Sequence, residues 1–180
     1  MNNSKIGVRY AKAFFELGIE KNKLDDFRKD IDFIAQTAQQ SDIQLLIESP
    51  VVKTSEKKKI FTDIFGKKIQ ELSLKFLLMI IDNRREVHIS AICRNFIQQY
   101  LDYKGIKAAV VTTATPVDKD LQEKITKVIA DIFKTEIELT TVEKEDIIGG
   151  FILRVGDKQL DASVSSKLSK IKREFLNKQV

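Results

Sequence analysis

Hydrophobic residues recur at helical spacing through the first hundred positions of the chain. Apolar residues three and four positions apart predict helices over about 4–20, 22–40, 41–49, 54–66, 69–82 and 86–104. Ser49-Pro50 ends the short third helix, and Gly66 and Gly105 follow the fourth and the sixth. Six helices joined by short turns predict a helical bundle.

Two of these predicted helices, over 4–20 and 69–82, have more apolar positions than one core-facing stripe contains. The first has one face formed by Ile6, Tyr10, Ala13, Phe14 and Leu17, and a second formed by Val8, Ala11, Phe15 and Ile19. The other has the stripes Ile69, Leu72, Phe76, Met79, Ile80 and Leu74, Leu77, Leu78, Ile81. Helices that are apolar over so wide an arc are covered on two sides. Either both lie at the centre of the bundle, or a helix of a partner docks across them.

The periodicity changes after Gly105. β-Branched or alternating segments predict strands over 106–114, 136–142 and 151–155. Helical patterns predict a helix that begins after Asp118 and a last helix over about 162–176. The expected fold class is therefore α+β: a six-helix bundle over residues 1–105, followed by a small α+β domain with the order β-α-β-β-α over 106–180.

Three glycines near the C-terminus raise the question of a phosphate-binding loop. Gly149 and Gly150 precede a predicted strand and Gly156 follows it, whereas phosphate loops join a strand to a helix and carry a Lys-Ser or Lys-Thr pair. We therefore interpret the pair as a tight entry into the strand, and Gly156-Asp157 as a turn.

The composition offers little catalytic chemistry. The chain has one cysteine, Cys93, and one histidine, His88, so it has few candidates for a general base, a disulfide or a metal cluster. A net charge of +5 suggests nucleic-acid binding, but acidic residues are interleaved with the basic ones nearly everywhere. No apolar stretch reaches the ~18–20 residues of a membrane span. We expect no catalytic residue, no cofactor and no metal.

Three segments resemble one known family. They are RYAKAFFELGIEKNKL (9–24), DNRREVHISAICRNFIQQY (82–100) and IIGGFILRVGDKQLDASVSSKLSKI (147–171). Together they resemble the delta subunit of F-type ATP synthases, whose mitochondrial counterpart is the oligomycin-sensitivity-conferring protein. The likeness extends over essentially the whole chain. At Arg84, family members often have a small residue, which leaves the local turn open.

The resemblance implies a stator connector with no active site. Its bundle would bind the N-terminal helix of an alpha subunit in a groove lined by Tyr10, Ala13, Phe14, Leu17, Phe76, Met79 and Ile80. Its α+β domain would bind the b subunits of the peripheral stalk near Val155, Leu160, Val164 and Leu168. Asp161 and Ser163 would cap the last helix, and Gly149, Gly150 and Gly156 would be structural.

The sequence leaves two other interpretations open. One is an all-helical RNA-binding factor of the antitermination type, and the other is a small transferase built on the α+β domain. The resemblance favours the connector, which would meet a membrane only through its complex and would bind no nucleic acid. Because the first residues do not form a transit peptide, we expect the cytoplasmic face of a bacterial inner membrane, or the equivalent face in an organelle that encodes the protein.

Overall fold

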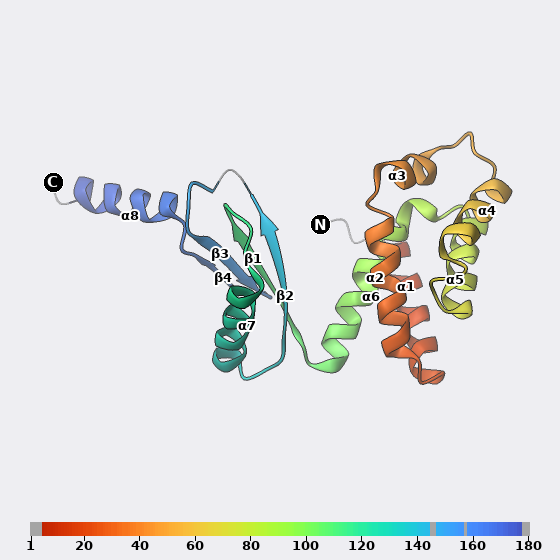
Figure 1. The fold of residues 1–180 in the computed structure, drawn as a ribbon, viewed down its shortest axis with the longest axis horizontal. Helices are drawn as coiled ribbons and strands as arrows, with labels where there is room; N and C mark the ends of the chain where they lie inside the picture. Colours follow the sequence, from red (N-terminus) through yellow and green to blue (C-terminus); the bar gives the residue numbers. More distant parts are fainter. Residues whose placement is uncertain (1–4, 145–146, 157, 178–180) are drawn as a thin grey trace. The chain divides into compact units, whose positions relative to one another are not determined.

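The computed structural model describes residues 5–144, 147–156 and 158–177. The chain divides into two compact units, residues 1–100 and 101–180, which we call the bundle unit and the sheet unit (Figure 1). Helices form the first unit, and a four-stranded sheet with helices forms the second. The predicted α+β class is therefore confirmed.

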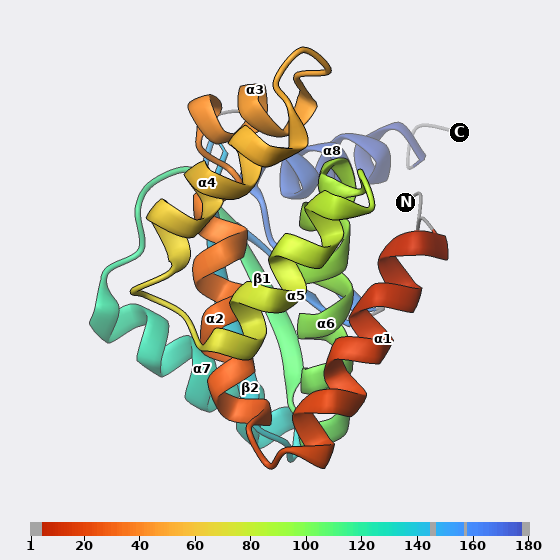
Figure 2. The ribbon, with the colours of Figure 1, turned by 90° about the vertical axis from the view of Figure 1, so that its right-hand side faces the viewer.

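Six α-helices follow one another from the start of the described chain, as the periodicity predicts (Figure 2). Their bounds are α1 Lys5–Glu20, α2 Leu24–Thr37, α3 Ser41–Glu48, α4 Thr54–Phe65, α5 Glu71–Asp82 and α6 Ile89–Lys104. A short 3₁₀ turn, η1 Glu86–His88, precedes α6. The expected start of the sixth helix at residue 86 is therefore a 3₁₀ turn rather than α-helix.

The centre of the bundle unit is an aromatic stack. The ring of Phe14 on α1 lies almost parallel to Phe27 of α2, with centroids 4.4 Å apart, and to Phe76 of α5 at 4.1 Å. Phe96 of α6 approaches the same ring at 5.5 Å. Four helices thus meet at one buried side chain, which is 1% exposed. Such rings bury large apolar areas and dominate the packing of a core.

Two buried polar groups hold helix ends in the bundle unit. The carboxylate of Asp30 on α2 accepts hydrogen bonds from the backbone N–H of Gln70 and the hydroxyl of Ser73, and so it caps the N-terminus of α5. Lys57 on α4 donates to Glu86 at 2.7 Å and to the carbonyl of Ile47 at 3.1 Å. The contacts of Asp30 fix α5 to α2, and those of Lys57 fix α4 to α3 and to η1.

The sheet unit contains β1 Lys107–Thr113, α7 Lys119–Phe133, β2 Ile137–Glu143, β3 Phe151–Val155, β4 Lys158–Asp161 and α8 Val164–Asn177. The strand order is β2-β1-β3-β4. β1 and β2 pair in parallel, with α7 in the connection between them, and β1–β3 and β3–β4 are antiparallel. The prediction missed β4, because its four residues, KQLD, contain one apolar residue and show no alternation.

The core of the sheet unit is small. Its buried cluster consists of Ala109, Ile129, Ile137 and Val155. Ile125, Phe133 and Leu153 pack partly buried against it. Other large apolar side chains of α7 stay exposed, including Val128 at 58% and Ile132 at 69%. The described part of this unit therefore leaves much of the apolar face of α7 uncovered.

Candidate partner-binding grooves

A groove of about 570 Å³ runs along α1 and α5 on the bundle unit, and we call it the bundle groove. It is lined by Ile6, Arg9, Tyr10, Ala13, Phe14 and Leu17 of α1, Phe76 and Met79 of α5, and Arg85 of the turn that follows. Phe14 and Phe76, stacked on each other, form its buried floor. Ala13 and Met79 are exposed on its walls, and Tyr10 and Leu17 are half-buried. The groove is thus a mainly apolar surface on a rigid base.

Six of the seven residues expected at this groove line it. The exception is Ile80, which is 1% exposed and lies in the core, where it lines a small internal space with Ile31 and Leu77. Met79 and Ile80 are consecutive in α5, so their side chains point about 100° apart. One therefore faces the groove and the other faces the core. Sequence reasoning missed Arg9 and Arg85, because it searched only for apolar stripes.

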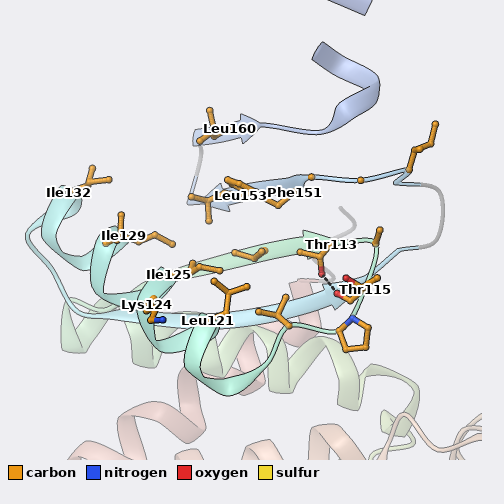
Figure 3. A pocket seen from close by; sticks show the side chains of 18 residues that line it. Thr113, Thr115, Leu121, Lys124, Ile125, Ile129, Ile132, Phe151, Leu153 and Leu160 are labelled. Atoms are coloured by element: carbon orange, nitrogen blue, oxygen red, sulfur yellow. Dashed lines mark hydrogen bonds between the residues drawn. The ribbon is translucent and has the colours of Figure 1, made fainter. Parts of the chain in front are cut away.

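A second groove, of about 740 Å³, lies in the sheet unit (Figure 3), and we call it the sheet groove. One wall is the apolar face of α7, with Leu121, Ile125 and Ile129; the other includes Phe151 and Leu153 of β3. The remaining lining residues are Val111, Thr113, Ala114, Thr115, Pro116, Val117, Lys124, Val128, Ile132, Ile148, Gly149, Gly150 and Leu160. Lys124 is the charged residue among them. Of the four residues that the resemblance assigned to a stalk contact, only Leu160 is among these lining residues.

The four residues expected to contact the stalk do not form one surface. Leu160 on β4 lines the sheet groove. Val155 ends β3 opposite Ala109 of β1 and is buried in the small core, so it is not available to a partner. Val164 and Leu168 are exposed on α8 and do not line the groove. The apolar face of α7, for which the sequence predicted no partner, forms one wall of the groove instead.

The paired glycines allow two backbone segments to approach each other. Gly150 has φ +81°, and a Cβ on it would lie 2.4 Å from the carbonyl oxygen of Ala162. The carbonyl of Gly149 accepts from the N–H of Val164, and that of Phe151 accepts from Ala162. The start of β3 is thereby fixed against the start of α8. Gly156 has φ +55° in open space, and Asp157 lies outside the described residues.

The beginning of α8 carries a side-chain cap. Asp161 accepts from the N–H of Ser163 at 2.9 Å and from the hydroxyl of Ser166 at 2.6 Å. The hydroxyl of Ser163 accepts from the N–H of Ser166 at 3.2 Å, as an N-cap residue does. Hydrogen bonds from Ser166 and then Ser163 lower the pKa of Asp161 below its ordinary value. The described residues contain no group of three His, Cys, Asp or Glu side chains placed to hold a metal ion.

Comparison with known proteins decides the family. The family model described as ATP synthase delta (OSCP) subunit matches residues 6–175. The chain belongs to the ATP synthase delta (OSCP) subunit family. A protein of Christiangramia forsetii named ATP synthase subunit delta is 36% identical over 97% of this chain and 95% of its own length. A protein of the same name from Flavobacterium psychrophilum is 32% identical over 98% of this chain and 100% of its own length.

The fold is also similar to a solved structure. A chain in the cryo-EM structure of the Toxoplasma gondii mitochondrial ATP synthase hexamer matches 96% of this delta-family chain with a TM-score of 0.76. At 20% identity, this likeness concerns the fold alone. Within the described residues, none of the helices combines the length and the apolar character that crossing a bilayer requires.

Proposed function

We propose that this delta-family chain connects the catalytic head of an F-type ATP synthase to its peripheral stalk and does no chemistry itself. The bundle groove binds the N-terminal helix of an alpha subunit, and the sheet groove binds a C-terminal helix of the stalk's b subunits. The observation that carries the proposal is one open apolar groove on each unit, within a family whose named relatives are ATP synthase subunits.

The bundle groove has the surface that an amphipathic helix recognises. Such a helix inserts apolar side chains three and four positions apart into a groove of matching length. Tyr10, Leu17 and Met79 are available on the walls, and the rigid floor limits the reorganisation needed on binding. Each large apolar side chain that the complex buries contributes about 1.5–3 kcal/mol. Several such contacts, from the groove and from the bound helix together, are needed to offset the association cost of about 4–15 kcal/mol.

The sheet groove has a similar character on the other unit. Leu121, Val128 and Ile132 are between 48% and 69% exposed on a single face of α7, an arrangement that is uncommon on a free monomer. A helix laid along α7 would cover them and complete the small core of the sheet unit. We therefore assign the stalk contact to the sheet groove. Of the four residues first expected at this contact, Leu160 alone lines that groove.

The mechanical role follows from two contacts on one chain. Rotation of the central shaft would carry the head around with it unless the head were anchored. A connector bound at both ends transmits the opposing force to the stalk, so that torque goes into ATP synthesis coupled to proton transport. The relevant property of each contact is slow dissociation under load, which depends on how well the groove is filled. The chain would meet the membrane only through the stalk, on the face where the catalytic head lies.

Calorimetric titration of the full chain with a peptide of the alpha subunit's N-terminus tests the head contact. Wild type should bind one peptide saturably, and Met79→Glu should weaken binding at least tenfold by placing a charge on the apolar wall. The matched control is Ile60→Glu on α4, because Ile60 is exposed to a similar extent, 37% against 43%, outside the groove. Equal binding by the two variants, or no binding by wild type, would refute this part of the proposal.

A further inference from the structure

The bundle groove carries positive charge that an apolar docking surface does not need. Arg9 and Arg85 line it, and both side chains are exposed. Neither guanidinium forms an ion pair, a side-chain hydrogen bond or a ring contact with any other residue that the structure describes. None of the residues that line the groove is acidic. The two charges are therefore available to a partner.

Both arginines belong to the same end of the groove. α1 and α5 run in opposite directions in the bundle unit (Figure 2), so the beginning of α1 lies beside the end of α5. Arg9 is in the N-terminal half of α1, and Arg85 is three residues beyond Asp82, where α5 ends. Leu17, near the C-terminal end of α1, lies toward the opposite end. The groove thus has a cationic end and an apolar end.

We infer that the helix bound in the bundle groove carries carboxylate side chains on the turn that lies against Arg9 and Arg85. The inference rests on the proposed function and specifies the chemistry of the partner. An apolar stripe can bind a helix in either direction, because apolar contacts are not directional. Paired arginines at one end remove that ambiguity: they favour the direction that places carboxylates beside them and oppose a helix with basic residues there.

Arginine suits this role because its planar guanidinium binds a carboxylate through two parallel hydrogen bonds. The charges at the rim of a groove also attract an acidic partner before contact, which raises the association rate and makes it sensitive to salt. The expected effect on affinity is moderate, because exposed pairs are partly screened by water and ions.

The experiment measures binding kinetics between the full chain and two peptides. One peptide is the N-terminal segment of the alpha subunit, and the other is the same segment with its Asp and Glu residues replaced by Asn and Gln. The proteins are wild type, the double variant Arg9→Gln/Arg85→Gln and the matched control Arg94→Gln. Arg94 is exposed on α6 and outside the groove, so the control also removes one positive charge.

We expect the double variant to bind the acidic peptide about tenfold more weakly, mainly through slower association and with less dependence on salt. Arg94→Gln should change affinity less than twofold. The amide peptide should bind wild type about tenfold more weakly than the acidic peptide does. It should bind the double variant with the same affinity as it binds wild type.

The possible failures are distinguishable. If wild type binds the acidic peptide and the double variant binds it equally well, the inference is overturned and the proposed function stands. If the double variant binds both peptides more weakly by the same factor, the arginines support the groove without meeting carboxylates, and the inference is again overturned. If wild type binds neither peptide, the assignment of the groove itself fails, and the inference fails with it.

Discussion

Replacing Phe14 by alanine should destabilise the bundle unit more than most single substitutions would. Its ring is 1% exposed and stacks on Phe27 and on Phe76, at centroid distances of 4.4 and 4.1 Å. Truncating a buried phenylalanine to alanine costs about 3–5 kcal/mol. Each well-placed aromatic pair adds about 0.5–1.5 kcal/mol beyond the buried area. We therefore expect a loss near the upper end, about 4–5 kcal/mol, out of a typical domain stability of about 5–15 kcal/mol.

Cys93 allows the stability of the bundle unit to be measured separately from that of the sheet unit. It is the single cysteine of the chain, it lies on α6 among the bundle core, and its side chain is 2% exposed. Burial raises the pKa of its thiol to about 12, so the native protein should react very slowly with thiol reagents. When opening is fast and reversible, the labelling rate follows the free energy of unfolding. Phe14→Ala should raise this rate on the order of a thousandfold.

The control for this experiment is Leu45→Ala on α3. Leu45 is 70% exposed, so its loss should change stability by less than about 0.5 kcal/mol. If Phe14→Ala raised the labelling rate less than tenfold, the aromatic stack would not be the structural floor of the groove. In that case, the claim that the bundle groove is a preformed surface would be wrong.

Four further substitutions test local features of the fold. Arg84→Gly should raise the free energy of unfolding in urea by about 0.5–1 kcal/mol, because φ at Arg84 is +53°. The strain of a residue with a Cβ in this left-handed conformation is larger than the entropy that a glycine loses on folding. A lower free energy of unfolding would contradict this. Gly150→Ala should lower the free energy of unfolding by about 2–4 kcal/mol, because the added Cβ would clash with the backbone of Ala162. Gly156→Ala should lower it by only about 1 kcal/mol, because the space around Gly156 is open. Equal losses for the two variants would refute the close approach at Gly150. The pKa of the Asp161 carboxyl, measured by NMR titration, should lie below its ordinary value of 3.8, and Ser166→Ala should raise it. The stability that the cap contributes should therefore be complete above pH 3.8 and be lost as the pH falls through the lower pKa of the folded state. A titration midpoint at or above 3.8 would contradict the hydrogen bonds.

The helices of the bundle could be predicted because their periodicity is strong and their turns are short. The orientation of α1 could not. Its buried residues are Gly7, Ala11, Phe14 and Gly18, a line that runs between the two apolar faces seen in the sequence. A search for large apolar residues overlooks this stripe, because small residues mark where helices approach closely: a Cβ on Gly7 would lie 3.2 Å from that of Ala91.

The candidate sites were predictable to different extents. The resemblance implied most of the bundle groove, and that groove lies on the two helices whose wide apolar arc the periodicity had singled out separately. The sheet groove was not predicted from the sequence, because a helix with a single apolar face, such as α7, has the pattern of a helix that packs on its own domain core. Only the structure shows that the cluster around Ala109 and Ile129 is too small to cover Leu121 and Val128. Short β4 carries no pattern that could separate it from a loop.

Site-specific photo-cross-linking in the assembled ATP synthase tests the central claim, that one chain holds both the head and the stalk. A photoreactive residue would replace Ala13, exposed in the bundle groove, or Val128, exposed in the sheet groove, with Ile60 as the control position. We predict that Ala13 captures the alpha subunit, that Val128 captures a b subunit, and that Ile60 captures neither. Capture of the same subunit from both grooves, or of no subunit from either, would contradict the account.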